Sequence, residues 1–174
     1  GRIFSMSNVH RLRNSERIFF ITANLSKNSS HLTEAEFAGL LHIFDSTRRR
    51  LGFLLCGYVL MPEHWHALIF PRYPLTISRV LQDVKSISGR RFNPRRGRKG
   101  ALWQHQFWDR FVRHGQEFRD RLEYMHRNPV TAGLVKRAED WRWSSCNNFA
   151  LDHSVVANCP MQIDYVELPD SYRA

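Results

Sequence analysis

Apolar and polar positions follow two rhythms along the chain, and each rhythm predicts one kind of element. Stretches rich in apolar and β-branched residues predict strands at 17–25, 53–61, 64–70 and 107–113. Apolar stripes at helical spacing predict helices at 33–50, 76–91 and 116–127, and Pro129 is expected to stop the last one. Thr33 and Glu36 form a capping box before the first helix. Pro62 and Glu63 alone separate the two middle strands, which predicts an antiparallel hairpin.

The order of these elements predicts the fold class. Strand, helix, strand, strand, helix, strand and a further helix is the order of a ferredoxin-like split βαβ sandwich, an α+β fold in which helices cover an antiparallel sheet. A chain of 174 residues suits one domain, which we assign to residues 1–150. After Ala150 carboxylates outnumber full cations. Residues 151–174 are therefore expected to be a mildly acidic C-terminal tail.

The charge of the chain favours a polyanionic partner. Lysine and arginine number 26 and aspartate and glutamate 16, for a formal net charge of +10. Such an excess attracts nucleic acid first and anionic membrane second. The longest apolar run, 53–61, is far shorter than the roughly 20 residues of a membrane-spanning helix, so we expect no membrane partner. Three cysteines outside any disulfide or zinc pattern, with no visible signal peptide, predict a protein of the reducing cytoplasm.

A basic surface interleaved with aromatic residues favours one kind of nucleic acid. Segment 89–100 places cations among glycine and proline, as an exposed loop does, and Trp103 and Phe107 follow it. Arginines neutralise phosphates and exposed rings stack on unpaired bases, so single-stranded or hairpin nucleic acid is favoured over plain duplex. The expected contacts are Arg48, Arg49, Arg50, Arg90, Arg91, Arg95, Arg96, Arg98, Lys99, Arg110 and Arg113. The alternative is that the rings fill the core and the arginines are merely solvated.

Two pairs of polar residues are candidates for chemistry. His64 and His66 flank Trp65 at the start of a predicted strand, so both imidazoles point to one face and offer half of a divalent-cation site. The alternative is a pair of structural histidines at a sheet edge. On the last predicted helix, Tyr124 lies off the buried stripe and shares its face with Asn128, four residues further on. The plain alternatives there are a surface tyrosine and a helix-ending asparagine.

Four blocks of sequence occur in a fixed order between about residues 15 and 150. They are GYVLMPEHWH at 57–66, WQHQFWDR at 103–110, EYMHRNPVTAGLV at 123–135 and DWRWSS at 140–145. Together they resemble the REP-associated tyrosine transposases, a branch of the single-tyrosine HUH transposases, where HUH means His-hydrophobic-His. Two positions depart from the family. Glu63 stands where the family often has Asn, which can perturb metal affinity, and Trp65 stands where it often has a smaller residue.

The resemblance implies an enzyme with the HUH endonuclease type of fold that cleaves and joins single-stranded DNA at palindromic hairpins of bacterial genomes. It implies that Tyr124 is the nucleophile of a covalent 5′-phosphotyrosine intermediate. It implies that His64, His66 and Asn128 bind a divalent cation, Mg²⁺ or Mn²⁺. The protein would be cytoplasmic and associated with the nucleoid when DNA-bound. A homodimer stays possible, because related transposases can assemble as dimers in which the tyrosine helix is donated to a partner.

Two competing functions stay open at this point. The first is a non-catalytic basic DNA- or RNA-binding module with a vestigial His-x-His site. The second is a metal-dependent nuclease that uses a metal-bound water and leaves no protein–DNA adduct. The sequence also identifies no general base for a tyrosine nucleophile, since His126, Asp120 and substrate or solvent are all candidates.

Overall fold

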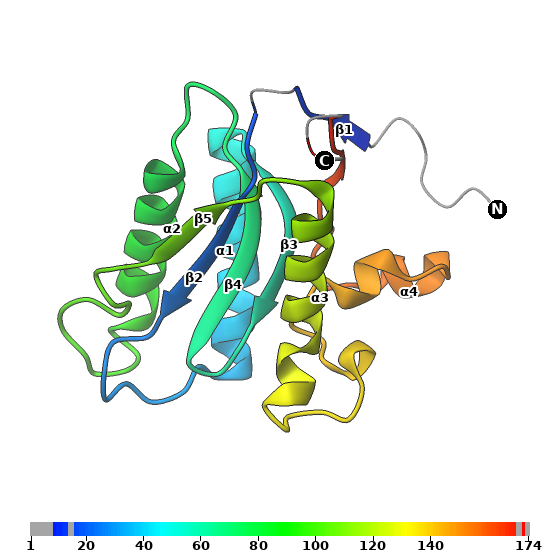
Figure 1. Cartoon of the computed structure of the whole chain (residues 1–174). Helices are drawn as coiled ribbons and strands as arrows, with labels where there is room; N and C mark the ends of the chain where they lie inside the picture. The colour runs from blue at the N-terminus through cyan, green and yellow to red at the C-terminus, as the bar shows by residue number, and fades with distance from the viewer. Residues whose placement is uncertain (1–8, 14–15, 170–171, 173–174) are drawn as a thin grey trace.

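A four-stranded sheet with helices on both sides forms the body of the protein (Figure 1). The structure, a computed structural model, describes residues 9–13, 16–169 and 172. The sheet and its main helices are β2 (Phe19–Asn24), α1 (Glu34–Leu51), β3 (Leu54–Leu60), β4 (His64–Phe70), α2 (Ile77–Phe92), β5 (Trp108–Phe111) and α3 (Gly115–Thr131). The smaller elements are β1 (Val9–Arg11), α4 (His153–Ala157), β6 (Tyr165–Glu167) and two 3₁₀ helices, Ala138–Asp140 and Cys146–Phe149. No helix in this described part of the chain is both long and apolar enough to cross a bilayer.

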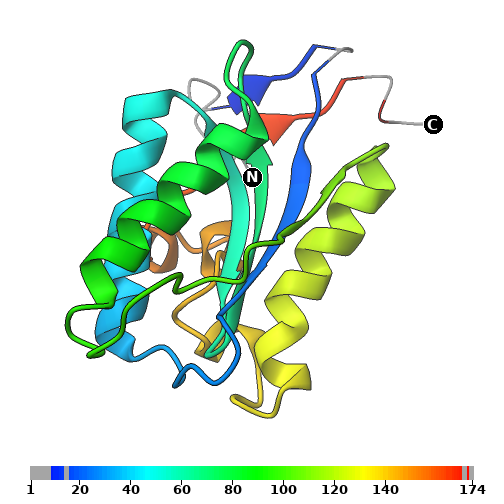
Figure 2. The same cartoon turned by 90° about the vertical axis from the view of Figure 1, so that its left-hand side faces the viewer.

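The strand order identifies the architecture. The strands lie in the order β3-β4-β2-β5 and every neighbouring pair is antiparallel. This is the order of the split βαβ sandwich, so the predicted α+β, ferredoxin-like fold is confirmed. Helices α1 and α2 cover one face of the sheet and α3 covers the other (Figure 2). A large hydrophobic cluster lies between the sheet and helices α1 and α2, and a smaller one lies between the sheet and α3.

Strand β3 is buried along its whole length, which explains its unbroken apolar sequence. Residues 143–145 cover its outer edge. Leu60 N–H donates to the Trp143 oxygen at 2.8 Å, and Ser145 N–H donates to the Tyr58 oxygen at 2.9 Å. Tyr58 N–H in turn donates to Ser145 Oγ at 3.0 Å. The DWRWSS block therefore closes this edge of the sheet.

Helix α3 packs closely over β3 because Gly57 leaves room for it. A Cβ atom at position 57 would lie 2.6 Å from Leu122 Cδ1 and 3.2 Å from Met125 Cε. At the start of the helix, His114 Nδ1 accepts a hydrogen bond from Glu117 N–H at 3.1 Å and caps the first turn. These contacts fix the position of α3 over the sheet.

Helix α3 does not stop at Pro129, so that prediction is wrong. It continues through the proline to its last residue, Thr131. Proline has a φ close to the helical value and removes one hydrogen bond, which is tolerated so near the helix end. Gly133, with φ of +74°, then turns the chain out of the helix. Asn128 is therefore inside the helix, one turn after Tyr124.

The segment expected to be an acidic tail packs against the domain instead. Met161 and Ile163 are buried in the larger hydrophobic cluster. The Asp164 carboxylate accepts hydrogen bonds from Leu55 N–H at 2.9 Å and from Arg48 at 3.0 Å. Strand β6 pairs in parallel with β1. Apolar side chains decide where this segment lies, and its described residues extend the same core rather than forming an appendage.

Candidate active site

The two histidines open β4 on the sheet face that α3 covers. The Nε2 atoms of His64 and His66 lie 3.1 Å apart. Two nitrogens that bind one cation at about 2.1 Å, roughly at right angles, lie about 3 Å from each other, so this spacing fits a shared ion. Trp65 points to the opposite face, where it is fully buried with its ring edge-on to Phe44. The alternation of the strand therefore produces the imidazole pair.

Each imidazole is held by a hydrogen bond at its other nitrogen. His66 Nδ1 lies 2.8 Å from Oγ1 of Thr22, its register partner on β2. His64 Nδ1 lies 2.9 Å from Glu63 Oε1. When Nδ1–H donates to these oxygens, each Nε2 keeps a lone pair for a cation. Burial, and after it the proximity of His64, lowers the pKa of His66 to about 3, so this ring is neutral at physiological pH.

Tyr124 projects from α3 towards the imidazole pair. Its ring centroid lies 5.6 Å from that of His66 and 6.3 Å from that of Phe20. Phe20 in turn stacks on His66, with 5.2 Å between centroids. Tyr124 nevertheless keeps 50% of its surface exposed. The phenol therefore lies beside His66 and remains accessible to a large substrate.

Asn128, the third ligand that the resemblance implies, lies one turn after Tyr124 on α3. Its Oδ1 atom is buried and has no hydrogen-bond partner among the residues that the structure describes. A buried amide oxygen without a partner is costly, and a cation would satisfy it. Two imidazoles and an amide oxygen suit Mn²⁺ or Mg²⁺ and leave positions for phosphate and water. The described residues hold no cluster of three or more His, Cys, Asp and Glu side chains that could offer another metal site.

Both side chains considered as general bases are engaged elsewhere. His126 Nε2 lies 2.8 Å from Ser145 Oγ, and its ring tilts against Phe149. Burial lowers the pKa of His126 to about 4, so its imidazole is neutral at physiological pH. The ring packs between α3 and the covered edge of β3. Asp120 accepts a hydrogen bond from Gln116 at 2.7 Å. Neither of these contacts involves Tyr124.

Two arginines expected to contact nucleic acid are committed to the fold. Arg96 donates to both carboxylate oxygens of Glu36, at 2.5 and 2.8 Å. Arg48 lies between Asp45 and Asp164, at 2.5 and 3.0 Å. Their side chains are only 10% and 14% exposed. We therefore assign Arg48 and Arg96 to the framework of the protein rather than to a nucleic-acid surface.

Most of the other basic residues named from the sequence lie on the surface. The exposed ones are Arg49, Arg50, Arg90, Arg91, Arg95, Lys99, Arg110 and Arg113. Arg50 pairs with Asp83 and Arg110 pairs with Glu117, and surface pairs of this kind are weak enough to exchange for a phosphate. Arg98 is half-buried and donates to Ser29 Oγ.

Helix α2 and the loop that follows it enclose a cleft of about 710 Å³ on the β5 side of the sheet. Arg90 lines it, together with Lys85 and Phe107. The Lys85 ammonium lies 5.0 Å from the centroid of the Phe107 ring. Trp103, by contrast, is buried and donates its Nε1–H to the hydroxyl of Ser88. Of the two rings that follow the basic loop, Trp103 fills the core and Phe107 borders the cleft.

A sequence model of the family described as "Transposase IS200 like" matches residues 16–115. The match spans more than half of the chain and contains β2 to β5 with both imidazoles. The chain belongs to the IS200-like transposases. Members of this family are enzymes. Tyr124 and Asn128 lie beyond the matched residues.

Comparisons with individual proteins identify a more specific group of similar transposases. A REP-associated tyrosine transposase of Escherichia coli (strain K12) is 29% identical over 128 residues, which are 73% of this chain and 74% of that protein. A Haemophilus influenzae protein, provisionally given the same description, is 28% identical over 153 residues, or 80% of this chain and 85% of that protein. The solved structure of a REP-associated tyrosine transposase bound to a REP hairpin matches with a TM-score of 0.67 at 27% identity, covering 87% of this chain and 86% of that one. The resemblance to REP-associated tyrosine transposases is confirmed.

Three residues beside the site were not singled out from the sequence. Thr22 and Phe20 contact His66 from β2, and the Arg121 guanidinium lies 4.9 Å from the centroid of the Phe20 ring. The contacts of Thr22 and Phe20 depend on the register between β2 and β4, which no local pattern reveals. Arg121 precedes Tyr124 by three residues on a helix, and that spacing is a signal that could have found it.

Proposed function

We propose that this transposase cuts and rejoins single-stranded DNA at a hairpin through a covalent 5′-phosphotyrosine on Tyr124. The observation that carries the proposal is the contact between the exposed phenol and the neutral His66 imidazole, with 5.6 Å between ring centroids. A tyrosine nucleophile and a cation site within one small volume are what attack on a phosphodiester needs. The similar protein that was solved with a REP hairpin supports a hairpin as the substrate.

In the proposed first step, Tyr124 Oη forms a bond to phosphorus while the bond from phosphorus to the 3′ oxygen breaks. The phenolic proton leaves to solvent or substrate, and the departing oxygen takes up a proton to become a free 3′ hydroxyl. The 5′ side of the break stays on the protein as a phosphotyrosine. Because one phosphodiester replaces another, the reverse attack by a 3′ hydroxyl rejoins a strand without ATP.

His64, His66 and Asn128 are the residues that would hold a divalent cation in this proposal. A bound Mg²⁺ or Mn²⁺ supplies positive charge that withdraws electrons from the phosphate. The hydrogen bonds of Thr22 and Glu63 keep both Nε2 atoms facing each other, so the chain itself orients these ligands.

The exposed cations supply the DNA-binding surface of the proposal. Arg90 lines the cleft beside α2, Arg110 lies on β5 and Arg113 follows that strand. Phosphates neutralised by such cations account for salt-dependent binding. A protein that cuts hairpins of a bacterial chromosome works where that chromosome lies, so the proposal places this transposase in the cytoplasm and at the nucleoid.

A denaturing gel tests the proposal. Single-stranded hairpin oligonucleotides labelled at the 3′ end are incubated with Mn²⁺ or Mg²⁺ and either the wild type or Tyr124→Phe. We expect a slowly migrating labelled adduct from the wild type and none from Tyr124→Phe, which still binds the hairpin. Cleavage without an adduct in both proteins would support a water-using nuclease. Binding without cleavage by the wild type, over a range of hairpins, would support a binding module.

A further inference from the structure

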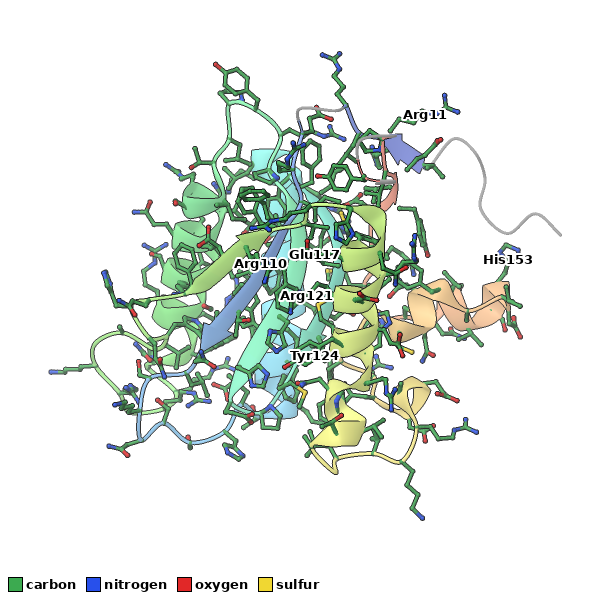
Figure 3. The ribbon with its side chains drawn as sticks, viewed as in Figure 1. Arg11, Arg110, Glu117, Arg121, Tyr124 and His153 are labelled. Carbon is green, nitrogen blue, oxygen red and sulfur yellow. The ribbon has the colours of Figure 1, made fainter. Side chains whose placement is uncertain are left out.

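Arg121 lies one helical turn before Tyr124 on the side of α3 that faces the sheet (Figure 3). Its guanidinium carbon is 4.9 Å from the centroid of Phe20, a cation–π contact that holds the charge in place. Phe20 also stacks on His66 and meets Tyr124 edge-on. One aromatic ring therefore positions a cation, an imidazole and a phenol beside each other.

The charge of Arg121 has no anionic partner in the described part of the chain. Glu117 lies one turn before it, at the spacing from which a carboxylate usually pairs with arginine. Glu117 instead binds Arg110 at 3.2 Å and accepts from Arg113 N–H at 2.9 Å. Among the residues that the structure describes, Arg121 forms no ion pair, whereas Arg127 on the same helix pairs with Glu123. An anion beside Tyr124 would complete the environment of Arg121.

We propose that Arg121 is a phosphate-binding catalytic residue, which holds the phosphodiester that Tyr124 attacks. This inference rests on the proposed function. Arginine suits the role because its planar group donates two hydrogen bonds to the two free oxygens of one phosphate. Phe20 keeps the guanidinium close to the phenol before DNA arrives, so the site is largely formed in advance. The engagement of Glu117 by Arg110 keeps a competing carboxylate away.

The contribution of Arg121 should be larger during the reaction than in binding. Negative charge gathers on the phosphate oxygens as Tyr124 Oη approaches phosphorus and the 3′ oxygen departs. Removal of one hydrogen-bond donor placed at that point typically slows a reaction by about 100- to 1,000-fold. The many other cations of the surface bind the rest of the DNA, so overall hairpin affinity depends little on this one residue.

The test compares wild type, Arg121→Lys and Arg121→Met, and uses Arg127→Met as the matched control from the same helix. Methionine retains the length to cover Phe20 but carries no charge. The scissile phosphate is first located with the wild-type adduct. Single-turnover adduct formation is then measured on that hairpin and on one in which a neutral methylphosphonate replaces the scissile phosphodiester. Thermal melting and hairpin binding are recorded for each variant.

We expect Arg121→Met to form the adduct about 100-fold more slowly than wild type on the phosphodiester, with hairpin affinity and melting temperature nearly unchanged. Arg121→Lys should be intermediate and Arg127→Met close to wild type. On the methylphosphonate, wild type and Arg121→Met should react at similar rates. Equal rates on the phosphodiester, or an undiminished difference on the methylphosphonate, would overturn the assignment of Arg121 alone. A wild type that forms no adduct would overturn the proposed function, and the role of Arg121 with it.

Discussion

The rings of Tyr124 and His66 meet within one chain, with 5.6 Å between their centroids. The first residue comes from α3 and the second from β4, and Gly57 allows the two elements to approach. Each copy of the protein therefore carries the proposed nucleophile together with the imidazole pair. No exchange of α3 between two copies is needed to assemble the site.

Mixing two inactive variants should therefore restore no activity. His64→Ala lacks one imidazole and Tyr124→Phe lacks the phenol. If α3 were exchanged between copies, a mixed dimer would contain one intact site, and the adduct would reappear on the denaturing gel. We expect no adduct at any ratio of the two variants. Wild type diluted with Tyr124→Phe is the control, and its activity should follow the amount of wild type.

Thr22→Val should weaken cation binding. The substitution keeps the shape of the side chain and removes the oxygen that holds His66 Nδ1. Loss of such a supporting hydrogen bond typically costs about 10- to 100-fold in metal affinity. Titration calorimetry with Mn²⁺ measures the effect, and Thr22→Ser, which keeps a hydroxyl, is the control expected to bind nearly as well as wild type. An unchanged affinity for Thr22→Val would show that this hydrogen bond does not orient the ligand.

Gly57→Ala should destabilise the protein and slow adduct formation. The new methyl group meets Leu122 Cδ1 at 2.6 Å, so α3 or its side chains must shift. Overpacking of this kind typically costs about 1–3 kcal/mol in unfolding free energy. Urea unfolding of both single variants and of Gly57→Ala with Leu122→Ala completes a double-mutant cycle. The double variant should lose less than the sum of the single ones, and strict additivity would argue against the predicted collision.

The pair between Glu36 and Arg96 should make stability depend on pH. Burial would raise the pKa of the Glu36 carboxyl, but hydrogen bonds from Arg96 and Thr33 outweigh burial and hold it below its ordinary value. The stabilisation is therefore complete above the ordinary carboxyl pKa of about 4.3 and is lost as the pH falls through the lower folded value. Glu36→Gln should reduce the unfolding free energy at pH 7 by about 1–3 kcal/mol.

Urea unfolding at pH 7, 5 and 3 measures this prediction, because the gap between wild type and Glu36→Gln should narrow at the lowest pH. Glu34→Gln is the control, since Glu34 is exposed in the same helical turn. A gap that stays constant from pH 7 to pH 3 would contradict a role for the charge of Glu36.

Asp164→Ala should destabilise the domain, although Asp164 lies in the C-terminal segment, far in sequence from β3. The carboxylate satisfies Leu55 N–H on β3 and pairs with the nearly buried Arg48. Its removal leaves both groups without this partner, at a cost of about 1–3 kcal/mol. The melting temperature should fall clearly for Asp164→Ala and little for Asp109→Ala, whose side chain is exposed on β5. Equal melting temperatures would mean that the segment docks without this carboxylate.

Features set by local spacing could be read from the sequence. The two-residue period of a strand places His64 and His66 on one face, and the four-residue period of a helix places Asn128 beside Tyr124. The split βαβ topology could also be predicted from the order of strands and helices along the chain, because few topologies are compatible with that order. These patterns involve neighbouring residues, and packing did not override them.

Features set by distant partners could not be read in this way. Arg96 looked like part of a basic surface because its partner Glu36 lies on another helix. The C-terminal segment looked like a tail because its net charge was visible and the burial of Met161 and Ile163 was not. Pro129 looked like a helix end, but one missing hydrogen bond near the last turn did not outweigh the packing of α3.

The two edges of the four-stranded sheet differ, because residues 143–145 cover the outer edge of β3. Trp143 and Ser145 form hydrogen bonds with backbone groups on the outer edge of β3, while β5 is the strand at the opposite edge of the sheet. From β5, Arg110 stands in register with Phe20, and Phe20 contacts Tyr124. Phe20 therefore connects β5, at the margin opposite the covered edge, with the phenol on α3.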